Sequence, residues 1–285
     1  MTRQMRLFYY GVLGAIGGLI GWHVSNLLGL SFAPSIYVAE IALGALIGFC
    51  VGACIGIAEG VVRRNLAQGL RAFAITGGLG LIGGAVALPV SEGFFQLLGG
   101  GTIGRVIGWG LFGLVTGLAA GFTAGTQRWK GALGGLLGGL LGGELFSVIY
   151  ALVKSTQVGK ALGFILLGAA VGVFIALIAY LLSRAWIEVK SGKMKGSEFI
   201  LDKFLPVTGP SAFIGSDALK SEIVLPDPDV APQHAMLKGH GTHFTLKDMS
   251  LSGTFINGKK IEQVKLSDKQ VIRVGNTELI YHEKR

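Results

Sequence analysis

The chain has 285 residues, of which 51% are hydrophobic and 14% charged, and its formal net charge is +9. The positive charge does not indicate binding to nucleic acid, because most of it lies before residue 186, where eleven Lys and Arg flank long apolar segments that contain four Asp and Glu. Cys50 and Cys54 lie four residues apart in one apolar segment, which excludes a disulfide between them and provides too few thiolates for a metal site.

Six apolar segments occupy the first two thirds of the chain. Each reaches the length of about 20 residues that an α-helix needs to cross the hydrocarbon core of a bilayer. We therefore predict a Gly-rich transmembrane domain over residues 1–185 that contacts membrane lipid. The predicted spans are residues 7–29, 36–62, 70–98, 103–125, 131–153 and 158–183.

The basic residues between these segments predict the orientation of the domain. If successive helices alternate in direction, eight Lys and Arg fall on one side of the membrane and three on the other. Because basic residues accumulate in cytoplasmic loops, we expect both termini in the cytoplasm. The larger group is Arg3, Arg6, Arg63, Arg64, Arg71, Arg128, Lys130 and Arg184, and the smaller group is Arg105, Lys154 and Lys160.

Glycines recur every fourth residue from Gly44 to Gly60, and shorter ladders follow in the fourth and sixth segments. Residues four apart share one face of a helix, where glycines let a second helix approach backbone to backbone. The odd-numbered segments carry adjacent glycine pairs instead, namely Gly17-Gly18, Gly83-Gly84 and Gly138-Gly139. This alternation predicts an α-helical bundle of three repeated hairpins.

Few polar residues lie inside the predicted spans. Glu40 and Glu59 are close to helix ends, where a charge can reach water at modest cost. His23, Glu92 and Glu144 lie deeper and occupy similar places in the three odd-numbered segments. We predict that they form a polar cluster at the centre of the bundle, either as an ion or proton pathway or as contacts that hold the helices together.

Residues 186–285 have the pattern of a separate β domain. Short segments with alternating apolar and polar residues are broken by turn residues such as Asn257-Gly258. About a hundred residues of this kind predict an all-β sandwich, joined to the last span with almost no linker. The predicted strands are residues 186–190, 198–201, 211–214, 223–225, 235–238, 243–247, 253–256, 271–274 and 278–281.

Three motifs in this domain resemble the forkhead-associated (FHA) family. They are Phe213-Ile-Gly215-Ser216, Pro232-Gln233-His234-Ala235 and the run DMSLSGTFING at residues 248–258. The resemblance implies an eleven-stranded β-sandwich whose loops at one end bind phosphothreonine peptides. The whole layout is similar to that of bacterial multi-span membrane proteins with an FHA domain, which implies a location in a bacterial plasma membrane.

The resemblance also implies roles for individual residues. Ser216 stands where the family has an arginine that grips the phosphate, Ala231 where it has a serine that also binds phosphate, and Ser252 where an asparagine holds the peptide backbone. Residues that match the family chiefly shape and brace the loops. They are Gly215, His234, Asp248, Gly253, Thr254, Asn257 and Gly258.

An arginine fork makes two charge-assisted hydrogen bonds to a phosphate, and each is worth about 1.5–3 kcal/mol. Lys220 or Lys238 could supply a point charge instead, without the planar fork. We therefore predict that the loop end binds a cytoplasmic protein without requiring phosphate, with recognition of a Thr-phosphorylated partner as the alternative.

Together these features predict a membrane-anchored FHA-like scaffold. A channel or transporter regulated by its FHA-like domain is one alternative. The other is a structural subunit of a larger membrane complex or homo-oligomer, whose glycine faces contact neighbouring subunits. We predict no enzymatic activity, cofactor or metal, because no catalytic arrangement is evident in the β domain and His240 and His243 share a turn without a third ligand.

Overall fold

The computed structural model describes residues 3–30, 35–63, 65–97, 102–123, 127–153 and 155–284, and for Arg3, Thr102 and Arg105 it describes only the backbone. Contacts divide the chain into two compact units. One contains the helical segments Arg6–Val61 and Gln68–Leu181, and the other contains Leu182–Arg285 together with the short segments Met1–Met5 and Val62–Ala67. Of the basic residues used to predict the orientation, Arg64, Lys154 and the side chains of Arg3 and Arg105 lie outside the described part of the chain.

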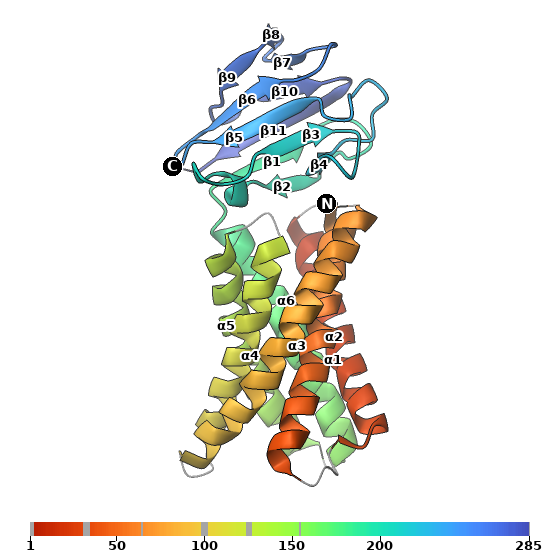
Figure 1. Ribbon diagram of the computed structural model, residues 1–285, viewed down its shortest axis with the longest axis vertical. Helices are drawn as coiled ribbons and strands as arrows, with labels where there is room; N and C mark the ends of the chain where they lie inside the picture. The colour runs from red at the N-terminus through yellow and green to blue at the C-terminus, as the bar shows by residue number, and fades with distance from the viewer. Residues whose placement is uncertain are drawn as a thin grey trace. The chain divides into compact units, whose positions relative to one another are not determined.

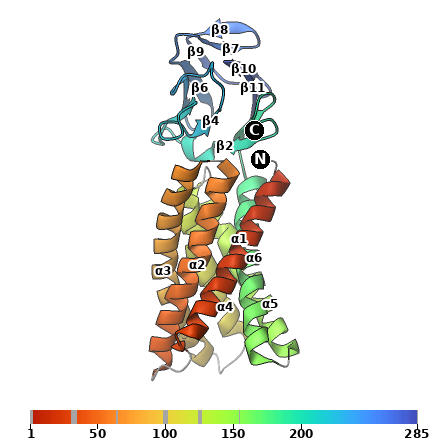
Figure 2. The same cartoon turned by 90° about the vertical axis from the view of Figure 1, so that its right-hand side faces the viewer.

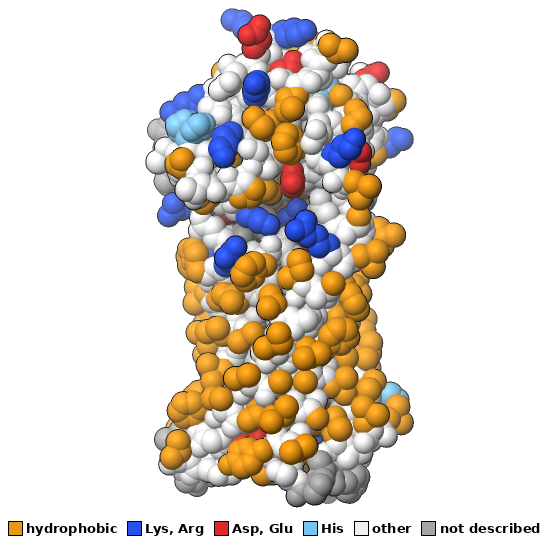
Figure 3. Space-filling model, viewed as in Figure 1, with side chains coloured by type: hydrophobic (Ala, Val, Ile, Leu, Met, Phe, Trp, Pro, Cys, Tyr) orange, Lys and Arg blue, Asp and Glu red, His pale blue; other side chains and the backbone are white. Residues whose placement is uncertain are grey.

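Six α-helices form the first unit, as the apolar segments predict (Figure 1). By length and composition, all six could cross a membrane. Figure 3 shows hydrophobic side chains over the visible surface of these helices. Hydropathy excludes polar residues at helix ends, such as Gln68, so the helices begin up to four residues earlier than the predicted spans. They are α1 (Arg3–Leu27), α2 (Ile36–Arg63), α3 (Leu66–Leu97), α4 (Thr102–Thr123), α5 (Arg128–Leu152) and α6 (Thr156–Leu181).

Contacts between neighbouring helices run around a closed ring, in which each helix packs against the next and α6 packs against α1 (Figure 2). The backbones approach most closely between α2 and α3, between α4 and α5, and between α6 and α1. At each of these interfaces, a Cβ added to a glycine would overlap a backbone carbonyl oxygen of the facing helix. The pairs of facing glycines include Gly48 with Gly80, Gly113 with Gly135, and Gly14 with Gly168.

The adjacent glycine pairs of the odd-numbered helices explain how the ring closes. In each pair, the first glycine contacts the following helix and the second contacts the preceding helix. The first glycines are Gly17, Gly83 and Gly138, which face α2, α4 and α6, and the second are Gly18, Gly84 and Gly139, which face α6, α2 and α4. The three hairpins thus use equivalent residues for equivalent contacts, in agreement with the predicted repeat.

The second unit is a β-sandwich of eleven strands in two sheets. The six-stranded sheet has the order β2-β1-β11-β10-β7-β8, and the five-stranded sheet has the order β4-β3-β5-β6-β9. Only β3 and β4 pair in parallel among the described strand pairs. The strands are β1 (Ala185–Val189), β2 (Glu198–Ile200), β3 (Ala212–Gly215), β4 (Ile223–Val224), β5 (Ala235–Gly239), β6 (Phe244–Asp248), β7 (Thr254–Ile256), β8 (Lys259–Ile261), β9 (Gln263–Lys265), β10 (Val271–Val274) and β11 (Thr277–Glu283).

Alternating residues of both sheets point inward and form one hydrophobic core, with Ile187, Ile214 and Leu246 fully buried. This alternation is the pattern that predicts most of the strands from the sequence. The edge strands β8 and β9 were not predicted, because their side chains are mostly exposed and polar and leave no alternation to detect.

Candidate functional site

Three loops of the sandwich contain the positions that the FHA resemblance assigns to partner binding. They connect β3 to β4, β4 to β5, and β6 to β7. Since β3, β5 and β6 are neighbours in the five-stranded sheet, the loops leave it at one end. Backbone hydrogen bonds join them: the amide of Ser216 donates to the carbonyl of Ala231 at 3.0 Å, and the amide of Met249 donates to the carbonyl of His234 at 2.9 Å.

The imidazole of His234 is completely buried and connects two of these loops. Its Nδ1 accepts a hydrogen bond from the amide of Ala231 at 3.1 Å, so the ring proton of the neutral side chain lies on Nε2. Nε2 lies 3.2 Å from the carbonyl oxygen of Gly253 and 3.0 Å from Oγ of Ser250. The structure therefore brings together three residues of the predicted site, Ala231, His234 and Gly253, around this ring.

Asp248 stabilises the conformation of the β6–β7 loop. Its Oδ1 accepts hydrogen bonds from the amide of Ser250 at 3.2 Å, from the Ser250 hydroxyl at 3.0 Å and from the Thr254 hydroxyl at 2.8 Å. Burial acts to raise the pKa of Asp248, but the hydrogen bonds from Thr254 and Ser250 outweigh it and hold the pKa below its usual value. The ionised carboxylate thus fixes the shape of the loop near neutral pH.

Gly215 and Asn257 shape the backbone and do not present a binding group. A Cβ at Gly215 would lie 2.7 Å from the carbonyl carbon of Pro232, so only glycine lets the β3–β4 and β4–β5 loops cross here. Asn257 occupies the turn between β7 and β8, with φ of 49°, and its side-chain oxygen accepts a hydrogen bond from the amide of Val271 at 3.1 Å. Asn257 therefore lies in a turn outside the three loops, where it shapes the backbone.

Ser216 and Ser252, which replace other residues of the family motif, differ in their surroundings. The hydroxyl of Ser216 donates a hydrogen bond to the carbonyl of Val230 at 2.8 Å, so it is occupied within the loop frame. Ser252 is exposed, and its hydroxyl lies 3.5 Å from that of Ser250. Neither residue offers a charge to a phosphate.

Lys260 is a cation at these loops that the sequence motifs do not indicate. A Cβ added at Gly253 would lie 2.9 Å from Nζ of Lys260, so this ammonium group lies against the β6–β7 loop. The hairpin at Asn257 turns β8 back so that Lys260 pairs with Phe255. Of the two lysines considered from the sequence, Lys220 lies on the β3–β4 loop, 3.9 Å from Asp217. Lys238 lies on β5, and its Nζ donates a hydrogen bond to the carbonyl oxygen of Gly209 at 3.1 Å.

The helical unit does not contain the internal polar cluster predicted from His23, Glu92 and Glu144. The side chains of His23 and Glu144 are exposed, and Glu92 is half-buried and accepts a hydrogen bond from Nε2 of Gln96 at 2.9 Å. The similar positions of these residues in the sequence repeat do not place them in the interior, because helix rotation directs two of them outward.

A different polar cluster is buried between α1 and α2. The guanidinium of Arg6 lies 3.1 Å from the carboxylate of Glu59, whose side chain is only 3% exposed. The hydroxyl of Tyr10 donates a hydrogen bond to the same carboxylate oxygen. The expectation that Glu59 reaches water is therefore wrong. The spacing of Arg6 and Tyr10 on one face of α1 was the available signal.

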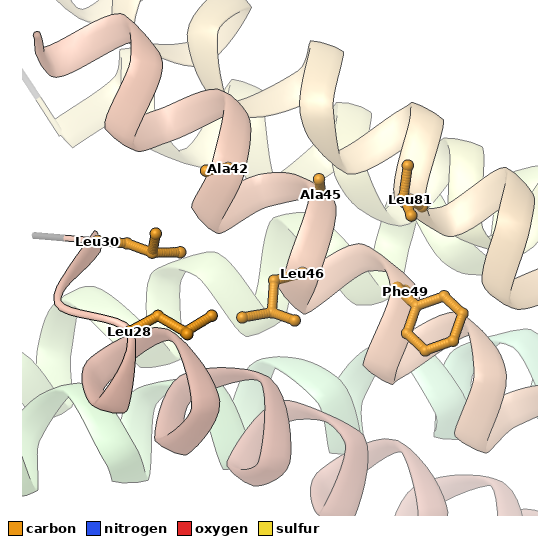
Figure 4. Close-up of a pocket in the computed structure, with 7 residues that line it drawn as sticks. All are labelled: Leu28, Leu30, Ala42, Ala45, Leu46, Phe49 and Leu81. Carbon is orange, nitrogen blue, oxygen red and sulfur yellow. The ribbon is translucent and has the colours of Figure 1, made fainter. Parts of the chain in front are cut away.

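An apolar pocket of about 380 Å³ lies between α2, α3 and the segment after α1 that carries Leu28 and Leu30 (Figure 4). Leu28, Leu46 and Phe49 are among its lining residues, and every lining side chain is a hydrocarbon. A pocket of this kind can accommodate an apolar chain, but it has no polar side chain to orient one.

Comparisons with known proteins link the β-sandwich to one family. The FHA domain family model matches residues 212–275. The chain is 31% identical over 98 residues to the glycogen accumulation regulator GarA of Mycolicibacterium smegmatis, a match that covers 34% of this chain and 58% of that protein. It is 30% identical over 98 residues to an oxoglutarate dehydrogenase inhibitor of Corynebacterium jeikeium, covering 34% of this chain and 63% of that protein.

Among solved structures, the FHA domain of the CT664 protein from Chlamydia trachomatis is 30% identical, and the match covers 36% of this chain and all of that chain with a TM-score of 0.33. The chain spans about three fifths of the length of the two curated relatives.

Proposed function

Because the C-terminal domain is a forkhead-associated domain, we propose that this chain is a membrane-anchored scaffold that recruits a protein partner through the three loops around His234. The internal hydrogen bonds of His234 and Asp248 give these loops a fixed shape before a partner arrives. A preformed surface loses less conformational entropy on binding.

We propose that the three loops recognise the partner without requiring a phosphate group on it. The observation that carries it is Ser216, which stands at the position of the arginine that grips phosphate in the family and has its hydroxyl bound to the carbonyl of Val230. Ala231 and Ser252 remove two further polar contacts that the family makes. Lys260 supplies a point charge, which attracts an anion but does not match the bidentate geometry of a phosphate.

The six apolar helices support a location in a bacterial plasma membrane, and the excess of basic residues on one side supports a cytoplasmic C-terminal domain. The partner would then be a cytoplasmic protein. The outward positions of His23 and Glu144 give no support to a polar pathway through the bundle, and so none to the channel or transporter alternative. We propose a binding role without catalysis.

Site-specific photocrosslinking in intact cells tests this proposal. A photoreactive phenylalanine analogue replaces Ser252 on the β6–β7 loop in one variant and Thr242 in the matched control. Both residues are exposed, and Thr242 lies in the turn between β5 and β6, at the other end of these strands. We expect one discrete protein adduct from position 252 and none from position 242, with the same yield after phosphatase treatment of permeabilised cells.

Two results would contradict the proposal. Equal adducts from positions 252 and 242 would mean that the loop end is not the docking surface. An adduct from position 252 that disappears after phosphatase treatment would assign the site to phosphothreonine recognition instead.

A further inference from the structure

Exposed apolar side chains gather at the loop end of the sandwich. Among the described residues after Leu182, four large apolar side chains are exposed, and three of them lie on the β3–β4 and β6–β7 loops. Leu219 is 82% exposed, Met249 49% and Leu251 104%, the last value being that of a side chain that projects freely into solvent. Their concentration on these loops marks a candidate contact surface.

Hydrogen bonds bring these loops together. The amide of Leu219 donates to the Asp217 carboxylate at 2.8 Å, which fixes the turn that presents the leucine. Nε2 of Gln233 donates to the carbonyl of Lys220 at 3.1 Å, and the amide of Met249 donates to the carbonyl of the next residue, His234. The residue after Leu219 is therefore connected through the β4–β5 loop to Met249.

A positive charge lies against the β6–β7 loop that carries Leu251. Nζ of Lys260 lies against Gly253, two residues further along the loop, and among the described residues no ion pair involves Lys260. A carboxylate that approached next to Leu251 would meet this ammonium group. Burying an exposed leucine against a partner contributes about tenfold to a hundredfold in affinity, whereas one exposed ion pair contributes a few fold.

We propose that the loop end recognises an unphosphorylated protein segment with a bulky apolar side chain, which packs against Leu219, Met249 and Leu251, and an adjacent carboxylate, which faces Lys260. This inference rests on the proposed docking function and specifies the chemistry of the partner. Insertion of the same loops into the bilayer is disfavoured because Asp217, Asp227 and Asp229 lie on the β3–β4 and β4–β5 loops, and carboxylates are costly in hydrocarbon.

Peptide binding to the 285-residue chain in nanodiscs tests the inference. Three labelled pools of nine-residue peptides share random flanks with one Asp or Glu next to the central residue. The central residue is Leu, Ile, Phe or Met in the apolar pool, Ser in the second pool and phosphothreonine in the third. We expect the apolar pool to bind at least about tenfold more tightly than either other pool. Fluorescence anisotropy measures the affinities.

Matched variants locate the contact. The double variant Leu219→Ser, Leu251→Ser should bind the apolar pool at least about tenfold more weakly than the unchanged chain does. Val207→Ser should leave it unchanged, because Val207 is also exposed, at 62%, but lies near Gly241 in the β5–β6 turn. Lys260→Gln should cost a few fold and reduce the salt dependence of binding. Unchanged unfolding midpoints would establish that each variant is folded.

Three outcomes would overturn the inference. The phosphothreonine pool could bind most tightly, or the double variant could bind the apolar pool as well as the unchanged chain. In a Leu251→Trp variant, quenching by brominated lipid in the nanodisc beyond that of Val207→Trp would assign the surface to the membrane. If the photocrosslink from position 252 persists while the apolar pool is unaffected by the double variant, docking stands and the apolar anchor is wrong. If the chain with Leu219 and Leu251 unchanged gives no specific crosslink from position 252, both proposals are refuted.

Discussion

Two glycines of α3 provide a matched test of the ring of helices. Gly80 faces α2, and a Cβ at this position would overlap the carbonyl oxygen of Gly48 and lie 2.9 Å from its carbonyl carbon. Gly78 lies two residues earlier in the same helix and has nothing within 4 Å of an added Cβ. Replacing each by alanine therefore adds the same methyl group to a closed contact in one case and to open space in the other.

The two substitutions share the gain in helix propensity, which is about 1 kcal/mol in water, so this effect cancels in their comparison. At Gly80, the helices must separate until the new methyl group reaches an ordinary contact distance of about 3.4 Å or more from the Gly48 carbonyl. Overpacking of this kind costs about 1–3 kcal/mol. We expect Gly80→Ala to be less stable than Gly78→Ala by this amount, and Gly78→Ala to be at least as stable as the unchanged chain.

Unfolding in mixed micelles, with sodium dodecyl sulfate titrated into a mild detergent and tryptophan fluorescence as the signal, measures the difference. Gly48→Ala should behave like Gly80→Ala, because the two glycines face each other. Equal stabilities of Gly80→Ala and Gly78→Ala would refute the close approach of α2 and α3.

Three further predictions concern the buried ion pair and the binding loops. Glu59→Gln leaves the buried guanidinium of Arg6 without its carboxylate, so it should lower the free energy of unfolding by about 3–5 kcal/mol in the same assay. Adding Arg6→Gln should recover part of this loss. No recovery would argue against the ion pair. Because the pKa of Asp248 is lowered in the folded state, its contribution is fully present above the unfolded value of about 3.9 and is lost as pH falls through the folded pKa. The unfolding midpoints of Asp248→Asn and the unchanged chain should therefore differ at neutral pH and converge in acid, and a constant difference would exclude this titration. Ser216→Arg supplies a guanidinium to the loop end and should raise affinity for a phosphothreonine peptide over its threonine counterpart by roughly tenfold or more in fluorescence anisotropy, whereas an unchanged ratio would mean that the arginine alone does not restore the site.

The sequence by itself determined the elements whose signals are local. A segment of about twenty or more mostly apolar residues defines each helix within about four residues, and inward-facing apolar residues define strands such as β1 and β5. The Asn257-Gly258 turn also follows from two neighbouring residues, both of which have positive φ. In each case the determining residues are close in the chain, so the folded environment is not needed to interpret them.

Contacts between distant residues depended on the tertiary structure. The helices are apolar on most sides, so the sequence could not determine which side of α1 faces α2 and which side faces outward. That rotation places Glu59 against Arg6, 53 residues away, and leaves His23 exposed. It also decides that Gly17 faces α2 whereas Gly18 faces α6.

In the binding loops, too, the sequence determined the local motifs and the tertiary structure determined the contacts between them. The FHA motifs located Gly215, His234 and Gly253 from the sequence, and the structure joined the latter two through the buried imidazole. Lys260 was absent from the predicted site because it lies seven residues after Gly253 on an edge strand without apolar alternation. Only the pairing of β7 with β8 brings its ammonium group to the loop, because a hairpin returns the chain to residues that it has already passed.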